Sequence, residues 1–182
     1  MKTRKHRIKK QNKTQYNTTY GEMEIKGIDT LYNHLLTKYN YNANCFMDLG
    51  SGKGAVCIHM AKQPAIEHVL GIELVDERHE EAVTLRDTLN ETDAKKVDLV
   101  LSDIFKVSLR KYKPMNVFIW ISSLCFPQEV VNNIFKKLKR ELRPGTIVCS
   151  SKTITTNIGT VLETITLPQS WNASHQATIY KL

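Results

Sequence analysis

The stretch that decides the fold is Phe46–Ala55, FMDLGSGKGA. An apolar run ends there at an acid, Asp48, and glycines follow at positions 50, 52 and 54. A strand that leads through a glycine-rich turn into a helix is typical of the ligand-binding edge of a doubly wound α/β sheet. The spacing Gly50-x-Gly52-x-x-Ala55 fits the loose dinucleotide pattern, so a bound phosphate is the first interpretation to test.

The rest of the chain alternates strand-like and helix-like segments. The hydrophobic pattern predicts strands at 45–49, 68–74, 96–104, 115–123 and 146–152 and helices at about 24–39, 55–62, 75–90 and 129–142. Asp76 is expected to cap the third of these helices. Segments 159–167 and 175–182 alternate apolar and polar residues across a short PQSWNA link, which predicts an antiparallel pair. The expected fold is an α/β, Rossmann-like doubly wound sheet, mostly parallel, with an antiparallel C-terminal strand pair.

The composition is that of an ordinary globular protein, with 41% hydrophobic and 24% charged residues among 182. No apolar run approaches a membrane span, and the N-terminus lacks the apolar core of a signal peptide. Cys45, Cys57, Cys125 and Cys149 lie far apart, in or beside apolar stretches. They are expected to be buried thiols in a reducing compartment, and no metal site is expected.

The positive charge is concentrated at the N-terminus. Residues 1–13 hold seven of the 26 basic residues, and no acid precedes Glu22. The remainder carries 19 basic and 18 acidic residues, a balance of +1, so the net charge of +8 belongs almost wholly to the arm. Such an arm is either a disordered solubilising tail or a contact to nucleic acid phosphates, and composition does not separate the two. The candidate nucleic-acid contacts are Lys2, Arg4, Lys5, Arg7, Lys9, Lys10 and Lys13. We expect a basic disordered arm over 1–18 and a single domain over 19–182.

Three acids at strand ends argue against a phosphate. Asp48 beside a pyrophosphate would place like charges together in a partly dry cleft, which is costly. S-adenosylmethionine has no phosphate, and its ammonium and sulfonium groups are cationic. Glu73 lies 21 residues after Gly52, where it can accept the ribose hydroxyls, and Asp103 can accept from the adenine amino group. The alternative is that Glu73 and Asp103 only cap the helices that follow them.

On these motifs the sequence resembles the class I S-adenosylmethionine-dependent methyltransferases. More narrowly it resembles the Dot-one (disruptor of telomeric silencing) family, histone lysine methyltransferases that lack a SET domain. The resemblance runs from about Tyr20 to the C-terminus. It rests on TYGE (19–22), FMDLGSGKG (46–54), GIE (71–73), SDI (102–104), SSLCFPQEV (122–130), GTIVCSSK (145–152) and IGTVLETITL with SWNASHQATIYKL (158–167, 170–182). The glycine loop alone matches many methyltransferases, whereas Tyr-Gly-Glu about 25 residues upstream of it is more specific.

The resemblance implies S-adenosyl-L-methionine as cofactor and S-adenosyl-L-homocysteine as product. It implies that Tyr20-Gly21-Glu22 covers the cofactor, with Glu22 near the methionine end. The cofactor-binding set that it implies is Tyr20, Gly21, Glu22, Asp48, Leu49, Gly50, Ser51, Gly52, Gly54, Glu73, Leu74, Asp103, Ile104 and Ser122.

On the substrate side, this chain has Ser122-Ser123-Leu124 where the family usually has Asn-Asn-Phe. A serine oxygen can still accept a hydrogen bond from an incoming amine. The catalytic candidates are Ser122, Phe126 and Tyr20. Trp120, Phe126 and Trp171 are candidates for an apolar channel wall, although Trp120 in mid-strand fits core packing better.

The function implied is methyl transfer to a lysine of a nucleosomal histone, in particular a histone H3 core lysine, with the arm on nucleosomal DNA. The location implied is the nucleus or another chromatin-containing, reducing compartment. A non-histone protein lysine and a methyltransferase-like nucleic-acid-binding scaffold are the alternatives. A DNA base is disfavoured because Ser122-Ser123-Leu124-Cys125 replaces the Asn/Asp-Pro-Pro-aromatic motif. DIFKVSLRKY (103–112) also resembles lysine methyltransferases of mitochondrial membrane proteins, which lack Tyr-Gly-Glu at this spacing. The sequence indicates neither the oligomeric state nor the methylation degree.

Overall fold

Residues 21–170 and 172–182 are described by a computed structural model of the chain. The arm, Tyr20 and Trp171 lie outside these residues. The predictions made for them, including the nucleic-acid contacts from Lys2 to Lys13, therefore stay predictions.

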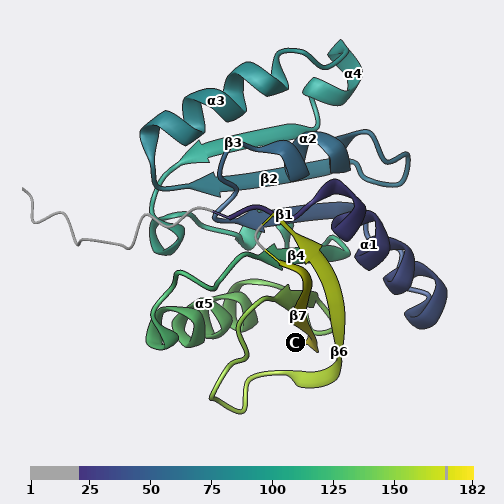
Figure 1. Ribbon diagram of the computed structural model, residues 1–182, viewed down its shortest axis with the longest axis vertical. Helices are drawn as coiled ribbons and strands as arrows, with labels where there is room; N and C mark the ends of the chain where they lie inside the picture. Colours follow the sequence, from purple (N-terminus) through teal and green to yellow (C-terminus); the bar gives the residue numbers. More distant parts are fainter. Residues whose placement is uncertain (1–20, 171) are drawn as a thin grey trace, which may run out of the picture.

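The described strands form a seven-stranded sheet in the order β3-β2-β1-β4-β5-β7-β6 (Figure 1). The first five strands run parallel, and β7 runs antiparallel to both β5 and β6. The strands are β1 Cys45–Leu49, β2 His68–Glu73, β3 Val97–Leu101, β4 Val117–Ile121, β5 Ile147–Ser150, β6 Thr160–Gln169 and β7 Asn172–Lys181. The predicted mostly parallel sheet with an antiparallel C-terminal pair is confirmed. The strand order reverses between β1 and β4, which makes the carboxyl ends of these strands the expected ligand site.

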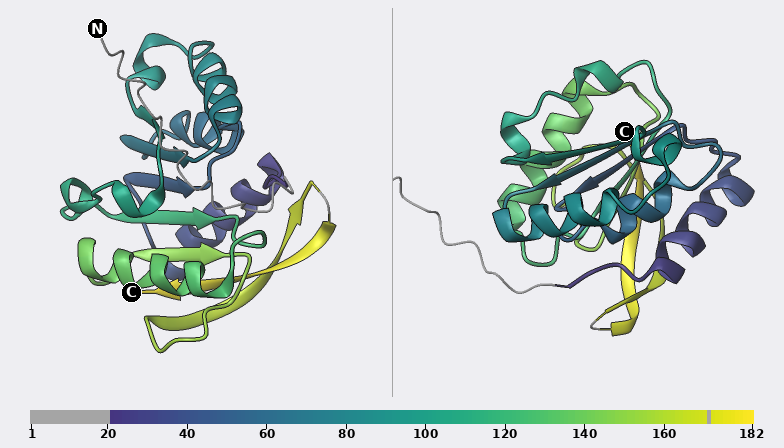
Figure 2. Two further views of the ribbon diagram at one scale, coloured as in Figure 1. Left: turned by 90° about the vertical axis from the view of Figure 1, so that its left-hand side faces the viewer. Right: turned by 90° about the horizontal axis from the view of Figure 1, so that it is seen from above.

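Helices cover both faces of the sheet (Figure 2). They are α1 Ile25–Tyr39, α2 Ala55–Ala61, α3 Asp76–Arg86, α4 Glu91–Ala94 and α5 Gln128–Glu141, with 3₁₀ turns η1 Ile104–Lys106 and η2 Arg110–Tyr112. Helices α1, α2 and α3 lie on one face, and α5 lies on the other with the turns that follow β3. Every residue of β1 and β4 is buried. Strands covered on both faces need apolar side chains on both, which explains why these segments read as continuous apolar runs.

The core is divided by the sheet into two clusters. Phe46 and Trp120 point toward α1 and α2, whereas Met47 and Leu49 pack with α5 on the opposite face. This alternation follows from the two-residue period of a strand. It brings Asp48, between Met47 and Leu49, onto the face of Trp120, its register partner in β4.

The C-terminal hairpin is longer than predicted, because β6 runs to Gln169 and β7 begins at Asn172. Helix α1 packs against β6 (Figure 1) and is tied to it through Glu163. The Glu163 carboxylate accepts hydrogen bonds from His34, Lys38 and Tyr39. The hairpin is therefore fastened to the first helix of the described chain.

Two local predictions are wrong. Helix α3 begins at Asp76, and Val75 holds the cap position without a side-chain hydrogen bond, so Asp76 is not the cap. Asp76 instead contributes negative charge to the first turn, where the helix dipole favours it. Cys125 is half-buried, unlike Cys45, Cys57 and Cys149, because it lies in the loop after β4 and not in a buried strand or helix.

Three short elements were not predicted. Helix α4 and the turns η1 and η2 have only three or four residues each. Such segments are too short to show a helical hydrophobic period. Across the described ranges, no helix has the length and apolar character needed to cross a membrane. The same ranges contain no grouping of three or more His, Cys, Asp or Glu side chains suited to a metal ion.

Candidate functional site

A cleft of about 540 Å³ opens at the carboxyl ends of β1, β2, β3 and β4. Its position is the point at which the strand order reverses, where open α/β sheets bind their ligands. Its volume lies in the range of small-molecule sites. The predicted residues that line it are Gly21, Glu22, Asp48, Gly50, Ser51, Gly52, Glu73, Leu74, Asp103, Ile104, Ser122 and Phe126.

The glycine loop after β1 is held tightly against its neighbours. Gly50 and Ser51 both donate from their backbone N–H to the carbonyl of Ile72, at 2.9 and 3.0 Å. Gly50 has φ +94°, and a Cβ there would lie 3.2 Å from the tip of the Phe126 ring. Only glycine adopts this conformation without strain and leaves room for the ring. The loop and Phe126 therefore form one wall of the cleft.

Glu73 connects the glycine loop to the end of β2. One carboxylate oxygen accepts from the Gly52 N–H at 2.8 Å, and the other accepts from Leu74 and Val75, each at 2.9 Å. The side chain is buried and lines the cleft. Glu73 was expected either to bind the ligand or only to cap the next helix. In the structure it holds the backbone before α3 and also faces the cleft.

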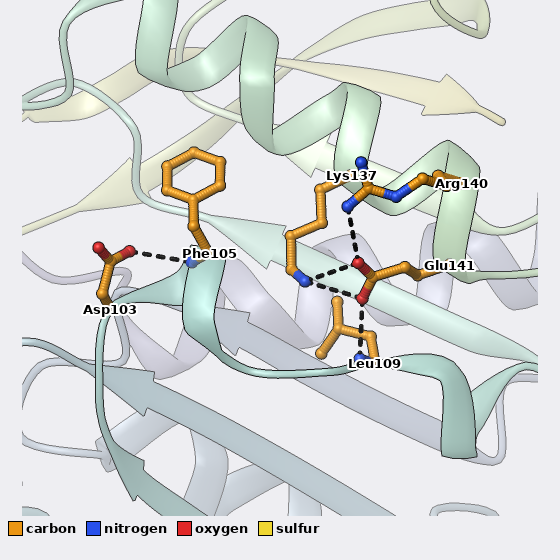
Figure 3. Close-up of polar contacts among 6 residues, drawn as sticks. All are labelled: Asp103, Phe105, Leu109, Lys137, Arg140 and Glu141. Atoms are coloured by element: carbon orange, nitrogen blue, oxygen red, sulfur yellow. Dashed lines mark hydrogen bonds and ion pairs between the residues drawn. The ribbon is translucent and has the colours of Figure 1, made fainter.

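Asp103 likewise both caps a short helical turn and lines the cleft. Its Oδ1 accepts from the Phe105 N–H at 2.9 Å and so caps η1 (Figure 3). Asp103 and Ile104 both line the cleft, as does Phe105, which is 44% exposed. The capping bond fixes this corner of the cleft.

Asp48 is a buried acid of the cleft whose surroundings disfavour its charged form. It is only 3% exposed, and burial raises the pKa of its carboxyl well above the usual range, with the negative charges of Glu73 and Glu22 adding to this. Within the described residues, Asp48 Oδ1 and Glu22 Oε1 are buried without a hydrogen-bond partner. Buried carboxylate oxygens without partners are costly, and a cation or hydrogen-bond donor in the cleft relieves that cost. These two carboxylate oxygens therefore suit a cationic ligand and would repel a phosphate.

The segment before α1 is held over the cleft by the β6–β7 hairpin. The Glu22 N–H donates to Ser170 Oγ at 3.0 Å, and the Ser170 N–H donates back to the Glu22 carbonyl at 2.9 Å. On the opposite side, the Ser122 hydroxyl donates to the Gly21 carbonyl at 3.5 Å. Contacts from the β6–β7 hairpin and from the loop after β4 therefore hold Gly21 and Glu22 at the cleft, where the charge of Glu22 acts on Asp48.

The loop that follows β4 is held by the end of β5. Ser123 Oγ lies 2.7 Å from Ser150 Oγ and accepts from the Lys152 N–H at 2.9 Å. Lys152 Nζ donates to the Phe126 carbonyl at 2.7 Å. These bonds give Ser150 and Lys152 a structural role, because they position the loop that carries Ser122 and Phe126.

Some predicted residues are not brought into the cleft. Leu49 is fully buried in the core beneath it. Gly54 lies behind the loop, with φ +79° and room for no side chain, since a Cβ would meet the Ala82 Cβ at 2.7 Å. Trp120 is 1% exposed and belongs to the core, although it also contributes to the cleft lining.

The sequence did not single out Arg78, Phe105 or Cys125, which also line the cleft. Phe105 follows Ile104 and Cys125 precedes Phe126 in the sequence. This adjacency to predicted site residues could have indicated that they line the cleft. Arg78 lies in the first turn of α3, and nothing in its sequence context distinguishes it from other charged residues of that helix.

The sheet order and the cleft define a class I methyltransferase fold. An RNA methyltransferase from Salinibacter ruber, solved with S-adenosyl-L-homocysteine, aligns with a TM-score of 0.57 at 19% identity, over 84% of this chain and 90% of that one. A magnesium protoporphyrin IX methyltransferase from Synechocystis PCC 6803, solved with S-adenosylmethionine, aligns with a TM-score of 0.61 at 14% identity, over 85% and 76%. At these identities the likeness concerns the fold.

The family is established by sequence. The model of the family described as histone methylation protein DOT1 matches residues 2–177, and the chain belongs to that family. A protein-lysine N-methyltransferase from Saccharolobus islandicus strain REY15A is 31% identical over 104 residues. That match covers 57% of this chain and 58% of the relative's length. The family expected from the motifs is confirmed.

Proposed function

We propose that this chain is an S-adenosylmethionine-dependent protein-lysine N-methyltransferase. The observation that carries the proposal is the group of acids in the cleft, in which Asp48 and Glu22 present buried oxygens without partners. Membership of the DOT1 family and the protein-lysine N-methyltransferase relative from Saccharolobus islandicus support lysine as the acceptor.

The cofactor supplies, when bound, an electrophilic methyl group on a cationic sulfonium. Asp48 and Glu22 would hold the cationic methionine end, since their unpaired oxygens favour positive charge. Glu73 would accept from the ribose hydroxyls, and Asp103 from the adenine amino group, with Ile104 against the ring.

The acceptor lysine would reach the cleft between Ser122 and Phe126. Ser122 Oγ can accept a hydrogen bond from the amine and orient its lone pair. Phe126 and Trp120 offer an apolar wall that would exclude water and lower the amine pKa by desolvation. Positioning and dehydration are the contributions that this chain makes, and no side chain is assigned as a general base.

We further propose a nucleosomal histone, with a histone H3 core lysine first, as the substrate, and nucleosomal DNA as the ligand of the arm. The family description and the concentration of charge in residues 1–13 support this. A chromatin-containing compartment such as the nucleus follows from the same proposal. The second candidate is a non-histone protein lysine, which the name of the Saccharolobus islandicus relative favours because it specifies no histone.

The decisive experiment separates cofactor binding from substrate choice. Calorimetric titration with S-adenosylmethionine should show binding to the unmodified chain and a loss of at least roughly ten-fold in Glu73→Gln, since a polar contact to a charged group contributes about 1.5 to 3 kcal/mol. Glu91→Gln, an exposed site on α4, is the matched control and should bind normally. Equal affinity in Glu73→Gln and Glu91→Gln would refute the cleft assignment.

Substrate choice is read by transfer of labelled methyl groups to nucleosomes, free histones, total protein extract or naked DNA. Label in a nucleosomal histone supports the proposed substrate, and label only in another protein supports the second candidate. Removal of residues 1–13 should weaken nucleosome binding and flatten its salt dependence while cofactor affinity stays unchanged. Unchanged nucleosome binding would show that the arm only aids solubility.

A further inference from the structure

Acidic and basic side chains of the described residues lie on different helices, although their numbers are nearly equal. Residues 75–94, which include α3 and α4, carry seven acidic and two basic residues. The segments 110–113 and 136–143, in η2 and the end of α5, carry eight basic residues and one acid. The part of the chain outside residues 1–13 has a balance of only +1, so a charge separation of this size within it calls for a physical explanation.

Six of these cations form a surface that we name the α5 basic face. All six are exposed: Arg110, Lys113, Lys136, Lys139, Arg140 and Arg143. Within α5, Lys136, Lys139 and Arg140 are three and four residues apart, which places them on one side of the helix, and Arg143 follows just beyond its end. The buried residues of α5, among them Val131, Ile134 and Leu138, occupy the opposite side. The cations therefore point to solvent as a group.

A buried acid holds the two halves of this face together. Glu141 accepts from the Leu109 N–H at 3.0 Å, from Lys137 Nζ at 2.7 and 2.9 Å, and from Arg140 Nη2 at 2.9 Å (Figure 3). Leu109 immediately precedes η2, so this carboxylate fixes the position of Arg110 relative to α5. The two backbone segments that carry the cations are thus held together before any ligand arrives, which lowers the entropy cost of binding.

Most of these cations have no acidic neighbour. Lys111, which is not part of the face, pairs with Asp98 at 3.0 Å, and Arg140 pairs with Glu141. Among the described residues, none of the other five members has a carboxylate within ion-pair distance. Like charges gathered without counter-charges repel one another, and a polyanion relieves that repulsion.

We propose that the α5 basic face binds the phosphate backbone of duplex DNA, as a contact additional to the arm. Interfaces between proteins are depleted in lysine and depend on apolar or aromatic anchors. The exposed large apolar side chains of the described chain are Ile25, Leu74, Leu101, Phe105 and Val161, and none lies in α5 or η2. A surface of lysine and arginine without such an anchor suits a regular line of phosphates. This binding needs neither the cofactor nor a lysine substrate, so it stands apart from the proposed methyl transfer.

The test compares two full-length variants that each lose three positive charges. One carries Lys136→Gln, Lys139→Gln and Arg143→Gln, and the control carries Lys26→Gln, Lys62→Gln and Lys95→Gln at exposed sites on other elements. Binding to a fluorescent duplex is measured across about 50 to 200 mM salt, where each phosphate contact contributes about 0.9 to the slope of log K against log salt. The α5 variant should lose up to about 2.7 of slope and bind at least roughly ten-fold more weakly than the control.

Equal affinity and equal slope in the two variants would overturn the proposal. A poly-glutamate peptide serves as the acidic-protein probe. If the α5 variant keeps its affinity for the duplex and loses binding to the peptide, the partner is an acidic protein and the DNA assignment is wrong. Cofactor titration on the same samples reports the cleft separately and should be unchanged in both.

Discussion

The buried Lys137–Glu141 pair gives a quantitative prediction about the stability of the fold. Their side chains are 5% and 7% exposed, so solvent screens this pair little. Burial alone would raise the pKa of Glu141, but hydrogen bonds from Lys137, Leu109 and Arg140 outweigh it and lower the pKa from 4.5 to about 2. At about 1.4 kcal/mol per pKa unit, this difference corresponds to about 3 kcal/mol in favour of the folded state.

Replacing Glu141 by glutamine keeps an oxygen for the Leu109 N–H and removes the charge that balances Lys137. We expect a loss of about 3 kcal/mol in the free energy of unfolding at neutral pH, the low end of the range for a buried charge without its partner. For a chain of this length, that loss lowers the melting temperature by about 6 to 12 °C. Adding Lys137→Met removes the unpaired charge and should recover about 2 kcal/mol of it.

The pH dependence has a definite sign. Because the pKa of Glu141 is lower in the folded state than in the unfolded state, its contribution is complete above about pH 4.5 and is lost as pH falls toward about 2. Urea unfolding of the unmodified chain and Glu141→Gln at stepped pH should therefore show their difference shrinking over that interval. Arg140→Gln is the control for an exposed partner and should cost less than about 1 kcal/mol. Equal urea midpoints for the unmodified chain and Glu141→Gln at neutral pH would refute the reasoning.

Three further predictions concern the cleft and the hairpin. Asp48→Asn should raise the thermal stability of the cofactor-free chain, because it removes a buried charge beside Glu22. The same variant should bind the cofactor at least roughly ten-fold more weakly in calorimetry. A variant that loses stability without losing affinity would contradict this. Ser170→Ala removes the acceptor of the Glu22 N–H and should raise the cofactor Kd about five-fold, the equivalent of about 1 kcal/mol, with no change expected in an exposed Ser108→Ala control. Burial and the hydrogen bond to Glu163 raise the pKa of Tyr39 to about 12, so tyrosine NMR of Glu163→Gln should show this pKa falling toward 10, and an unchanged value would exclude Glu163 as a cause.

The fold could be predicted because its decisive segments are long apolar runs at regular intervals. Segments such as Val117–Ile121 must be covered on both faces, and that requirement alone indicates a parallel sheet between helices. The cap of α3 could not be predicted in the same way. Val75 holds the cap position without a side-chain hydrogen bond, so no capping residue marks the start of the helix in the sequence. The Glu73 carboxylate accepts from the backbone N–H groups of Leu74 and Val75, which precede the helix, and so fixes the turn that leads into it.

The site residues that could be predicted are those whose place in the sequence, at the end of a strand, already fixes their place in the sheet. Asp48, Glu73 and Asp103 each lie within two residues of the carboxyl end of a parallel strand, so the sheet itself brings them to one edge. The contribution of Ser170 was not predictable, because 148 residues separate it from Glu22 and only the antiparallel hairpin brings them together. The same holds for Lys152, whose bond to the Phe126 carbonyl depends on the packing of β5 beside β4.

The charge distribution shows why composition can mislead about partners. A balance of +1 outside residues 1–13 indicates no electrostatic partner for the folded part, and attention therefore goes to the arm. In the structure, however, the acids of α3 and the cations of α5 lie on opposite faces of the sheet (Figure 2), where they cannot neutralise one another. The local field at α5 depends on Lys136, Lys139 and Arg143 and on the counter-charges near them, and a summed charge averages these away. Removing the arm alone should therefore leave a residual, salt-dependent affinity for DNA, and its complete loss would show that the α5 basic face makes no contact.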